Sequence, residues 1–125
     1  MPSKLEHLSK AEHNENFYQS FDLNTTPYLD WVVNGIFYSA VHYIESYLSS
    51  QGKDPQTHWE RTQDIRDNNN LDNTFFRKYK SLKDDSEGAR YYMQKFTPGE
   101  IQLIISQLHD IKDYLKKYIP EIQLA

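Results

Sequence analysis

The sequence predicts an all-α protein, an up-and-down antiparallel bundle of four long helices with short helices added. Three observations predict it. Apolar residues recur at helical spacing over several long segments, the connections between these segments are short, and no segment reads convincingly as a strand. With 125 residues, the chain is the size of one domain, so we expect a single domain over residues 1–125.

The first helix is expected from Lys4 to Phe21. Ser3 and Glu6 have the spacing of a capping box, in which each side chain accepts a hydrogen bond from the other residue's backbone N–H. Apolar residues then follow at helical spacing: Leu5, Leu8, Ala11 and Tyr18.

The second helix is expected from Pro27 to Ser50, with Thr26 as its N-cap and Pro27 at its first position. It is apolar over most of its circumference, so we expect other helices to surround it. Polar groups such as His42 and Glu45 interrupt the apolar run and would be costly in lipid, which favours a buried core helix over a membrane span. The loop that follows contains Gly52, a residue suited to a helix C-terminus.

The third helix begins near Thr57, where Thr57 and Glu60 form a second capping-box pattern, and ends near Asn68-Asn69-Asn70. The fourth is expected over residues 73–83. After it, Asp84-Asp85-Ser86 could cap a short turn over residues 87–92.

The last helix has the clearest start, with Thr97 as N-cap, Pro98 at the first position and Glu100 as capping-box partner. Pro120 ends it. Its apolar stripe consists of Ile101, Ile104, Ile105, Leu108, Ile111, Leu115 and Tyr118.

Composition excludes some classes of protein. The net charge of −4 argues against nucleic-acid binding by bulk charge alone. The absence of cysteine rules out disulfides and thiolate metal sites, and fits a reducing cytosol. The charged N-terminal segment has no apolar stretch of a signal peptide. We therefore expect a cytoplasmic protein that is not attached to a membrane.

Tyr38, His42 and Glu45 share one face of the second helix. Two interpretations stay open. The three groups point into a polar cleft, where His42 can exchange protons near neutral pH, or they satisfy one another in a closed core.

A metal site is not expected. Di-iron bundles use Glu-x-x-His on paired helices, whereas this chain has the reverse order, His42-x-x-Glu45, and only once. His7 and His13 are six residues apart and do not share a helix face well. We therefore expect neither a metal nor another cofactor.

His58 and Arg61 lie on one face of the first turn of the third helix. A helix N-terminus attracts anions, and the planar guanidinium of Arg61 matches phosphate. An exposed first turn without function is an equal alternative. Arg90, beside Tyr91, could pair with Asp85 or Glu45, or it could face the same cleft as Arg61.

These residues together resemble a bacterial branch of the HEPN family (higher eukaryotes and prokaryotes nucleotide-binding domains). The resemblance covers roughly residues 27–92. It is carried by Phe37-Tyr38-x-Ala40-x-His42, by His58-x-x-Arg61 and by Ala89-Arg90-Tyr91.

The resemblance implies a compact helical bundle that is often dimeric. Many relatives are RNA-cleaving toxins or RNA-processing factors, encoded beside nucleotidyltransferases or in defence loci, and others are non-catalytic binding domains. The RNases of the family use an arginine followed about four to six residues later by a histidine. No arginine here has that neighbour, and His58-x-x-Arg61 has the reverse order, so the family's catalytic assignment does not transfer.

We therefore expect a HEPN-like domain that binds RNA, a nucleotide or another phosphate ligand, as a toxin–antitoxin or defence component with a degenerate or altered RNase site. Arg61 and Arg90 would hold phosphate, in a cleft with Tyr38, Glu45 and Tyr91. Whether the chain is an enzyme stays open; the one reaction to consider is metal-independent RNA cleavage by His58, Arg61 and His42. The expected partners are a second copy of the chain and a nucleotidyltransferase-type protein. The alternative is a non-catalytic dimerisation or protein-interaction module.

Overall fold

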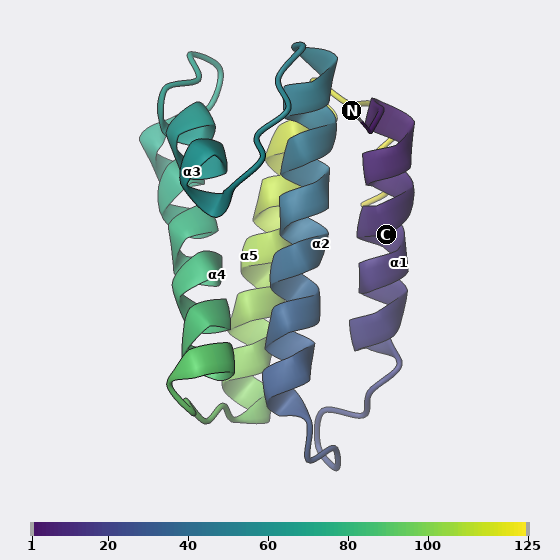
Figure 1. Ribbon diagram of the computed structural model, residues 1–125. Coiled ribbons are helices and arrows are strands. Elements are labelled where there is room, and N and C mark those ends of the chain that lie inside the picture. The colour runs from purple at the N-terminus through teal and green to yellow at the C-terminus, as the bar shows by residue number, and fades with distance from the viewer. Residues whose placement is uncertain (1, 125) are drawn as a thin grey trace.

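The computed structural model describes residues 2–124, which form five helices and no strand (Figure 1). The predicted all-α class with four long helices is confirmed, and one short helix stands where short helices were expected. The helices are α1 (Lys4–Gln19), α2 (Leu29–Ser50), α3 (His58–Arg66), α4 (Asn73–Tyr91) and α5 (Pro98–Lys116).

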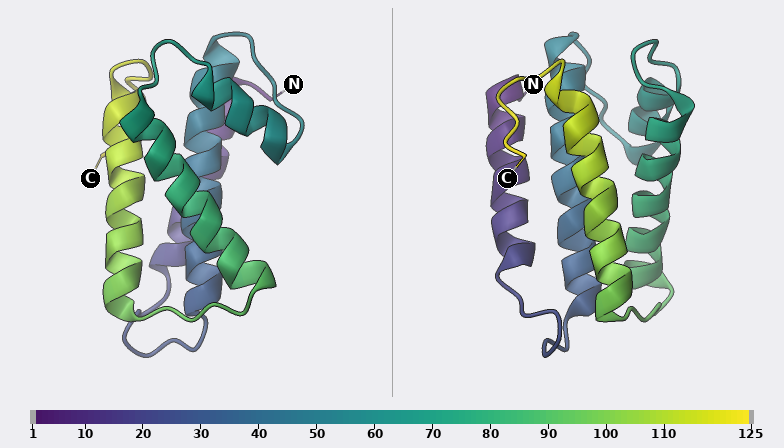
Figure 2. Two further views of the ribbon diagram at one scale, coloured as in Figure 1. Left: turned by 90° about the vertical axis from the view of Figure 1, so that its left-hand side faces the viewer. Right: turned by 180° about the vertical axis from the view of Figure 1, so that it is seen from behind.

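The central helix is α2, as its apolar circumference predicts. In Figure 1, α1 lies on one side of it, α4 on the other and α5 behind, and the four long helices run alternately down and up. The short α3 lies in front of α4, near the end of the bundle where α2 finishes. The left view of Figure 2 shows that α4 crosses α5 obliquely, so the two diverge toward one end.

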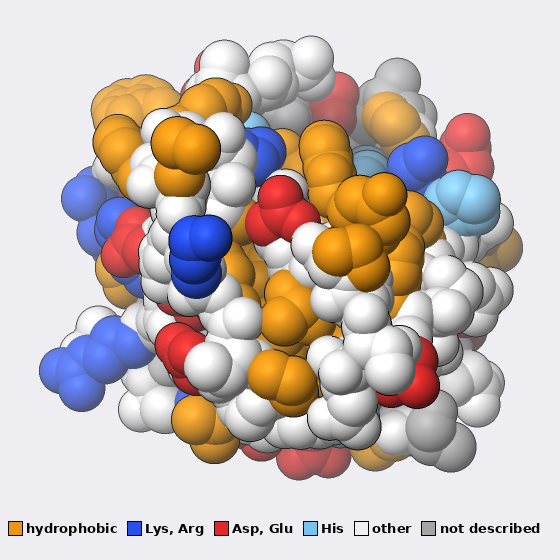
Figure 3. Space-filling view, turned by 90° about the horizontal axis from the view of Figure 1, so that it is seen from below, with side chains coloured by type: hydrophobic (Ala, Val, Ile, Leu, Met, Phe, Trp, Pro, Cys, Tyr) orange, Lys and Arg blue, Asp and Glu red, His pale blue; other side chains and the backbone are white. Residues whose placement is uncertain are grey.

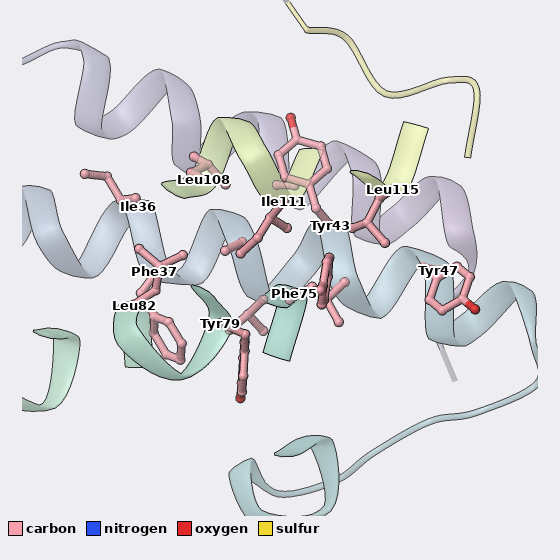
Figure 4. Close-up of a cluster of buried hydrophobic side chains, with 14 of the residues drawn as sticks. Ile36, Phe37, Tyr43, Tyr47, Phe75, Tyr79, Leu82, Leu108, Ile111 and Leu115 are labelled. Carbon is pink, nitrogen blue, oxygen red and sulfur yellow. The ribbon is translucent and has the colours of Figure 1, made fainter. Parts of the chain in front are cut away.

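The core is built from the inner faces of all four long helices. Large side chains such as Phe37 and Tyr79 are fully buried between α2 and α4, and Tyr43 is fully buried on the other side of α2, toward α1 and α5 (Figure 4). Asn34, Ser39, Glu45 and Ser46 of α2 are also buried. Within residues 2–124, no helix combines the length and the hydropathy needed to cross a bilayer.

The start of α2 differs from the prediction. The helix begins at Leu29 rather than Pro27, and its N-cap residue, Tyr28, makes no side-chain cap. The hydroxyl of Thr26 instead accepts a hydrogen bond from the backbone N–H of Tyr28, at 3.1 Å. Thr26 therefore closes a local turn in the connection rather than capping the helix.

The fourth helix is longer than predicted. Asp84-Asp85-Ser86 does not interrupt α4, which continues to Tyr91. Ion pairs four residues apart support this part of the helix, with Lys80 bonded to Asp84 and Lys83 to Glu87. The hydroxyl of Ser86 is buried and donates to the side-chain oxygen of Asn34 at 2.7 Å. Ser86, which was expected to cap a turn, instead joins α4 to α2.

The other helix starts were predicted well. Ser3 with Glu6 and Thr97 with Glu100 form complete capping boxes. At α3, Thr57 caps the backbone N–H of Glu60. The carboxylate of Glu60 accepts from the backbone of Gln56 rather than from that of Thr57, so the predicted box is only half formed.

Gly35 allows α1 and α2 to approach closely. A Cβ atom at this position would lie 3.0 Å from Cδ2 of Phe17 and 3.2 Å from Cβ of Tyr18. Cβ of Tyr18 is attached to the backbone and cannot give way easily. Gly35→Ala should therefore destabilise the protein by about 1–2 kcal/mol, even though alanine favours helix.

Urea denaturation measures this effect. The matched control is Gly99→Ala, where the added Cβ would meet only the Thr97 hydroxyl, at 4.0 Å. The control should be neutral or slightly stabilising. Equal stability of the two variants would show that the helices can separate at Gly35 without cost.

Candidate functional site

A pocket of about 380 Å³ lies along α2, between α1 and α4. Three aromatic side chains, Phe17, Trp31 and Tyr38, form part of its wall. The other lining residues are Lys10, His13, Asn14, Asn34, Gly35, His42 and Arg90. Its volume lies within the range of ordinary small-molecule sites.

The charge of this pocket is opposite to that of the chain. Its lining contains two cations, Lys10 and Arg90, and two imidazoles, His13 and His42, with no carboxylate. The whole chain carries a net charge of −4. A concave surface with only positive charges favours an anionic ligand.

Arg90 is held at one side of the pocket by uncharged groups. Its Nη1 atom donates to the hydroxyl of Ser86 and, at 3.4 Å, to the side-chain oxygen of Asn34. The guanidinium lies 5.5 Å from the ring centre of Tyr38 and 5.1 Å from that of Tyr91. Among residues 2–124 no carboxylate pairs with Arg90, and no group accepts a hydrogen bond from its Nη2 atom. Its charge is therefore left for a ligand.

Arg61 has a different environment. It is 8% exposed. Its Nε atom donates to Oε1 of Glu45 at 2.9 Å, and its Nη2 atom lies 2.9 Å from the same oxygen in an ion pair. Its Nη1 atom lies 2.8 Å from Nδ1 of His58. Because arginine has no acceptor, His58 accepts this bond through Nδ1. The described partners of Arg61 thus occupy three of its donor atoms, and Arg61 lies behind the pocket rather than in its wall.

The remaining oxygen of Glu45 faces two histidines. Oε2 lies 3.4 Å from Nδ1 of His7 and 3.7 Å from Nδ1 of His42, and the two Nδ1 atoms are 3.1 Å apart. His7 comes from α1, and the other two come from α2. The packing of α1 on α2 therefore builds a cluster that neither helix contains alone.

Two of the histidines are shifted toward the neutral form. Burial lowers the pKa of His42, and the negative charge of Glu45 opposes this only in part. Burial also lowers the pKa of His58, with the nearby cations of Arg61 and Arg90 acting in the same direction. Near pH 7 both imidazoles serve as neutral hydrogen-bonding groups.

The structure separates the predicted site residues into two sets. Tyr38, His42 and Arg90 lie in the pocket wall. Glu45 and Arg61 form a buried ion pair next to it, and Arg61 holds His58, whose ring centre is 6.5 Å from that of Tyr38. Tyr91 is largely exposed and stacks on Arg90. Direct phosphate binding by Arg61 stays a prediction, and its observed contacts do not favour it.

Sequence reasoning missed one wall of the pocket. Lys10, Asn14 and Phe17 come from α1, which the sequence analysis did not connect with the site. Lys10, His13 and Phe17 are largely exposed and recur at helical spacing. That spacing could have marked an exposed face of α1, but it could not show that the face lies beside Tyr38.

Fold and site together define a class, an all-α bundle with a basic pocket partly walled by aromatic side chains. Compared with protein-family models, with curated proteins and with solved structures, the chain matches none. The chemistry of the pocket therefore has to carry the functional proposal.

Proposed function

We propose that this chain is a HEPN-like domain that binds a nucleotide or RNA in the pocket between α1, α2 and α4. One observation carries the proposal: the pocket combines cations and imidazoles with aromatic rings and has no carboxylate in its lining. A nucleotide needs both a positive group for its phosphate and a flat apolar surface for its base.

Arg90 is the group that would bind phosphate. It is fixed by Ser86 and by the rings of Tyr38 and Tyr91, so little side-chain entropy is lost when a ligand binds. Its fork of donors matches phosphate oxygens. Lys10 extends the same positive surface from α1.

Trp31 is the group on which a base would stack. It is 55% exposed although it lies in the pocket wall, and aromatic stacking on a base contributes about 1–3 kcal/mol. Of the two tryptophans, Trp31 lies in the pocket wall and Trp59 does not, so a ligand in this pocket should change the part of the intrinsic fluorescence that comes from Trp31.

Arg61 takes a positioning role in this proposal. It holds Glu45 and His58 and does not line the pocket. Cleavage of RNA by His58, Arg61 and His42 stays a prediction that follows from the residue types together with the family resemblance. Incubation with end-labelled RNA and excess chelator gives its readout, since the reaction in question needs no metal.

Arg90→Ala should weaken nucleotide or RNA binding about 10- to 100-fold, because it removes one or two charge-assisted hydrogen bonds to phosphate. Titration of AMP, ADP, ATP and a short single-stranded RNA, followed by intrinsic tryptophan fluorescence and calorimetry, measures the loss. Urea denaturation of the same variant shows that the fold is kept.

The matched control is Arg77→Ala, which removes the same charge from an exposed position on the same helix. It should leave the affinity within about twofold of the wild type. Equal losses in both variants would indicate nonspecific attraction to the surface, and no binding to any of the four probes would refute the proposal.

A second candidate function, a dimerisation or protein-interaction module, is favoured by a different surface. Tyr28, Tyr92 and Met93 are exposed to 54%, 76% and 89%, near a hollow between the α1–α2 and α4–α5 connections. Figure 3 shows hydrophobic side chains gathered at this end of the bundle. A homodimer, or a complex with a nucleotidyltransferase-type partner, would cover them. Light scattering of the purified chain tests the homodimer, and Met93→Glu should shift a dimer toward the monomer.

A further inference from the structure

The cluster of His7, His42 and Glu45 presents three metal-ligand atoms to one point in space. The distances between them are 3.1, 3.4 and 3.7 Å. Zinc binds imidazole nitrogen and carboxylate oxygen at about 2.0–2.1 Å, so two ligand atoms of a tetrahedral site lie about 3.3–3.4 Å apart. The observed triangle has the size of one face of such a tetrahedron.

We propose that His7, His42 and Glu45 bind a divalent transition-metal ion of the zinc type, through Nδ1 of each imidazole and Oε2 of the carboxylate. Two imidazoles and a carboxylate form a donor set that zinc commonly takes. The inference does not rest on nucleotide binding, because the distances among these three ligand atoms carry it by themselves.

The surroundings of Glu45 fit this role. The hydrogen bond and the ion-pair contact from Arg61 both go to Oε1, which fixes the carboxylate and leaves Oε2 facing the histidines. Groups that hold a ligand in this way are a regular part of metal sites. Glu45 and His7 are 8% and 7% exposed, while His42 reaches the pocket wall. The ion would thus be held in the protein beside the pocket.

The charge balance predicts what the ion would do there. The negative charge of Glu45 is already matched by Arg61, and neutral imidazoles add none. The positive charge of a divalent ion would therefore not be neutralised at this site. Because the protein supplies three ligands, a fourth coordination position would be left for water or an anion. The ion would add to the positive charge beside the pocket.

Without a metal, contacts this short among two Nδ1 atoms and a carboxylate oxygen require a hydrogen on at least one of the two nitrogens. Two Nδ1 atoms at 3.1 Å and a carboxylate oxygen form a hydrogen-bonded cluster only if at least one imidazole carries hydrogen on Nδ1. The rival explanation is thus a proton-linked structural cluster, and metal titration distinguishes the two.

The test uses the full chain, with any histidine tag removed and metals stripped by a chelator. Co²⁺ should bind at one equivalent and give the visible bands of a tetrahedral site, and Zn²⁺ should displace it. Zinc at about a hundredfold excess over its Kd should raise the Tm by roughly 5–10 °C. In nitrogen NMR spectra of the unaltered protein, Zn²⁺ should shift the Nδ1 signals of His7 and His42.

Variants then locate the site. His7→Gln and His42→Gln should each lower the affinity by more than about tenfold, whereas His109→Gln, at an exposed position on α5, should not change it. The absence of stoichiometric binding, or unchanged Nδ1 signals for His7 and His42, would overturn the proposal in favour of the hydrogen-bonded cluster. If a variant fails to fold, the NMR result on the wild type decides.

Discussion

Lys112→Met should destabilise the bundle by about 3–5 kcal/mol, as expected when one partner of a buried ion pair is removed. Lys112 on α5 is 2% exposed and Glu15 on α1 is 8% exposed. The ammonium donates to both carboxylate oxygens of Glu15, at 3.0 and 3.1 Å. Without it, Glu15 would keep a buried charge with the hydroxyl of Tyr43 as its remaining described donor.

The arrangement around Glu15 links three helices. The hydroxyl of Tyr43 on α2 donates to the Glu15 carboxylate, and Nζ of Lys112 lies 5.1 Å from the ring centre of Tyr43. Burial and the neighbouring Glu15 raise the pKa of Tyr43 above its usual value, so the phenol stays protonated and remains a donor. Loss of the lysine therefore affects the packing of α1, α2 and α5 together.

The double variant Glu15→Gln with Lys112→Met separates charge burial from lost contacts. It removes both charges and keeps an acceptor for Tyr43, so most of the loss should be recovered. Urea denaturation gives the free energies. Lys80→Met, which breaks the exposed pair with Asp84, should cost less than about 1 kcal/mol. A small effect of Lys112→Met would mean that water or another group reaches Glu15.

The sequence predicted what local chemistry controls. Helix starts at Ser3 and Thr97 follow from side chains that bond backbone groups three residues away, and the central position of α2 follows from its apolar circumference. The errors at the start of α2 and the end of α4 also came from reading local capping patterns. Thr26 and Ser86 were read as caps because both residue types cap helices, but Ser86 is bonded to Asn34 of another helix.

Residue spacing predicted the candidate site within one helix, and the cleft expected from the family resemblance also brought Arg90 of α4 together with Tyr38 of α2. Tyr38 and His42 were placed on one face correctly, because the spacing of a helix fixes that relation. The approach of His7 to His42, and of Lys112 to Glu15, depends on which faces of α1, α2 and α5 meet. A buried lysine on an apolar stripe also contradicts the usual pattern, so no local signal indicates it.

Arg61 was predicted to bind a ligand, but in the structure it anchors the short helix α3 to the bundle. Arg61 and Ile65 are the two buried residues of this short helix, and Arg61 attaches it to Glu45 of α2. An arginine with this many internal partners contributes mainly to the stability of the fold. Arg90, held by uncharged groups, can give up its contacts at much lower cost.

Arg61→Ala should therefore destabilise the protein by about 3 kcal/mol or more and loosen α3 from the bundle, because Glu45 would be left buried without its cation. Urea denaturation measures the first effect, and amide hydrogen exchange along α3 measures the second. Arg66→Ala is the matched control, since Arg66 lies on the same helix but its ion pair with Asp67 is exposed; it should cost less than about 1 kcal/mol.

The result also decides between the two roles of Arg61. A stable Arg61→Ala variant that no longer binds nucleotide or RNA would place Arg61 on the ligand, against the contacts seen in the structure. A destabilised variant whose remaining folded population binds with nearly normal affinity would assign Arg61 to the support of Glu45 and His58. Because Arg90→Ala should show the opposite pattern, with stability kept and affinity lost, the pair of variants assigns each arginine its role.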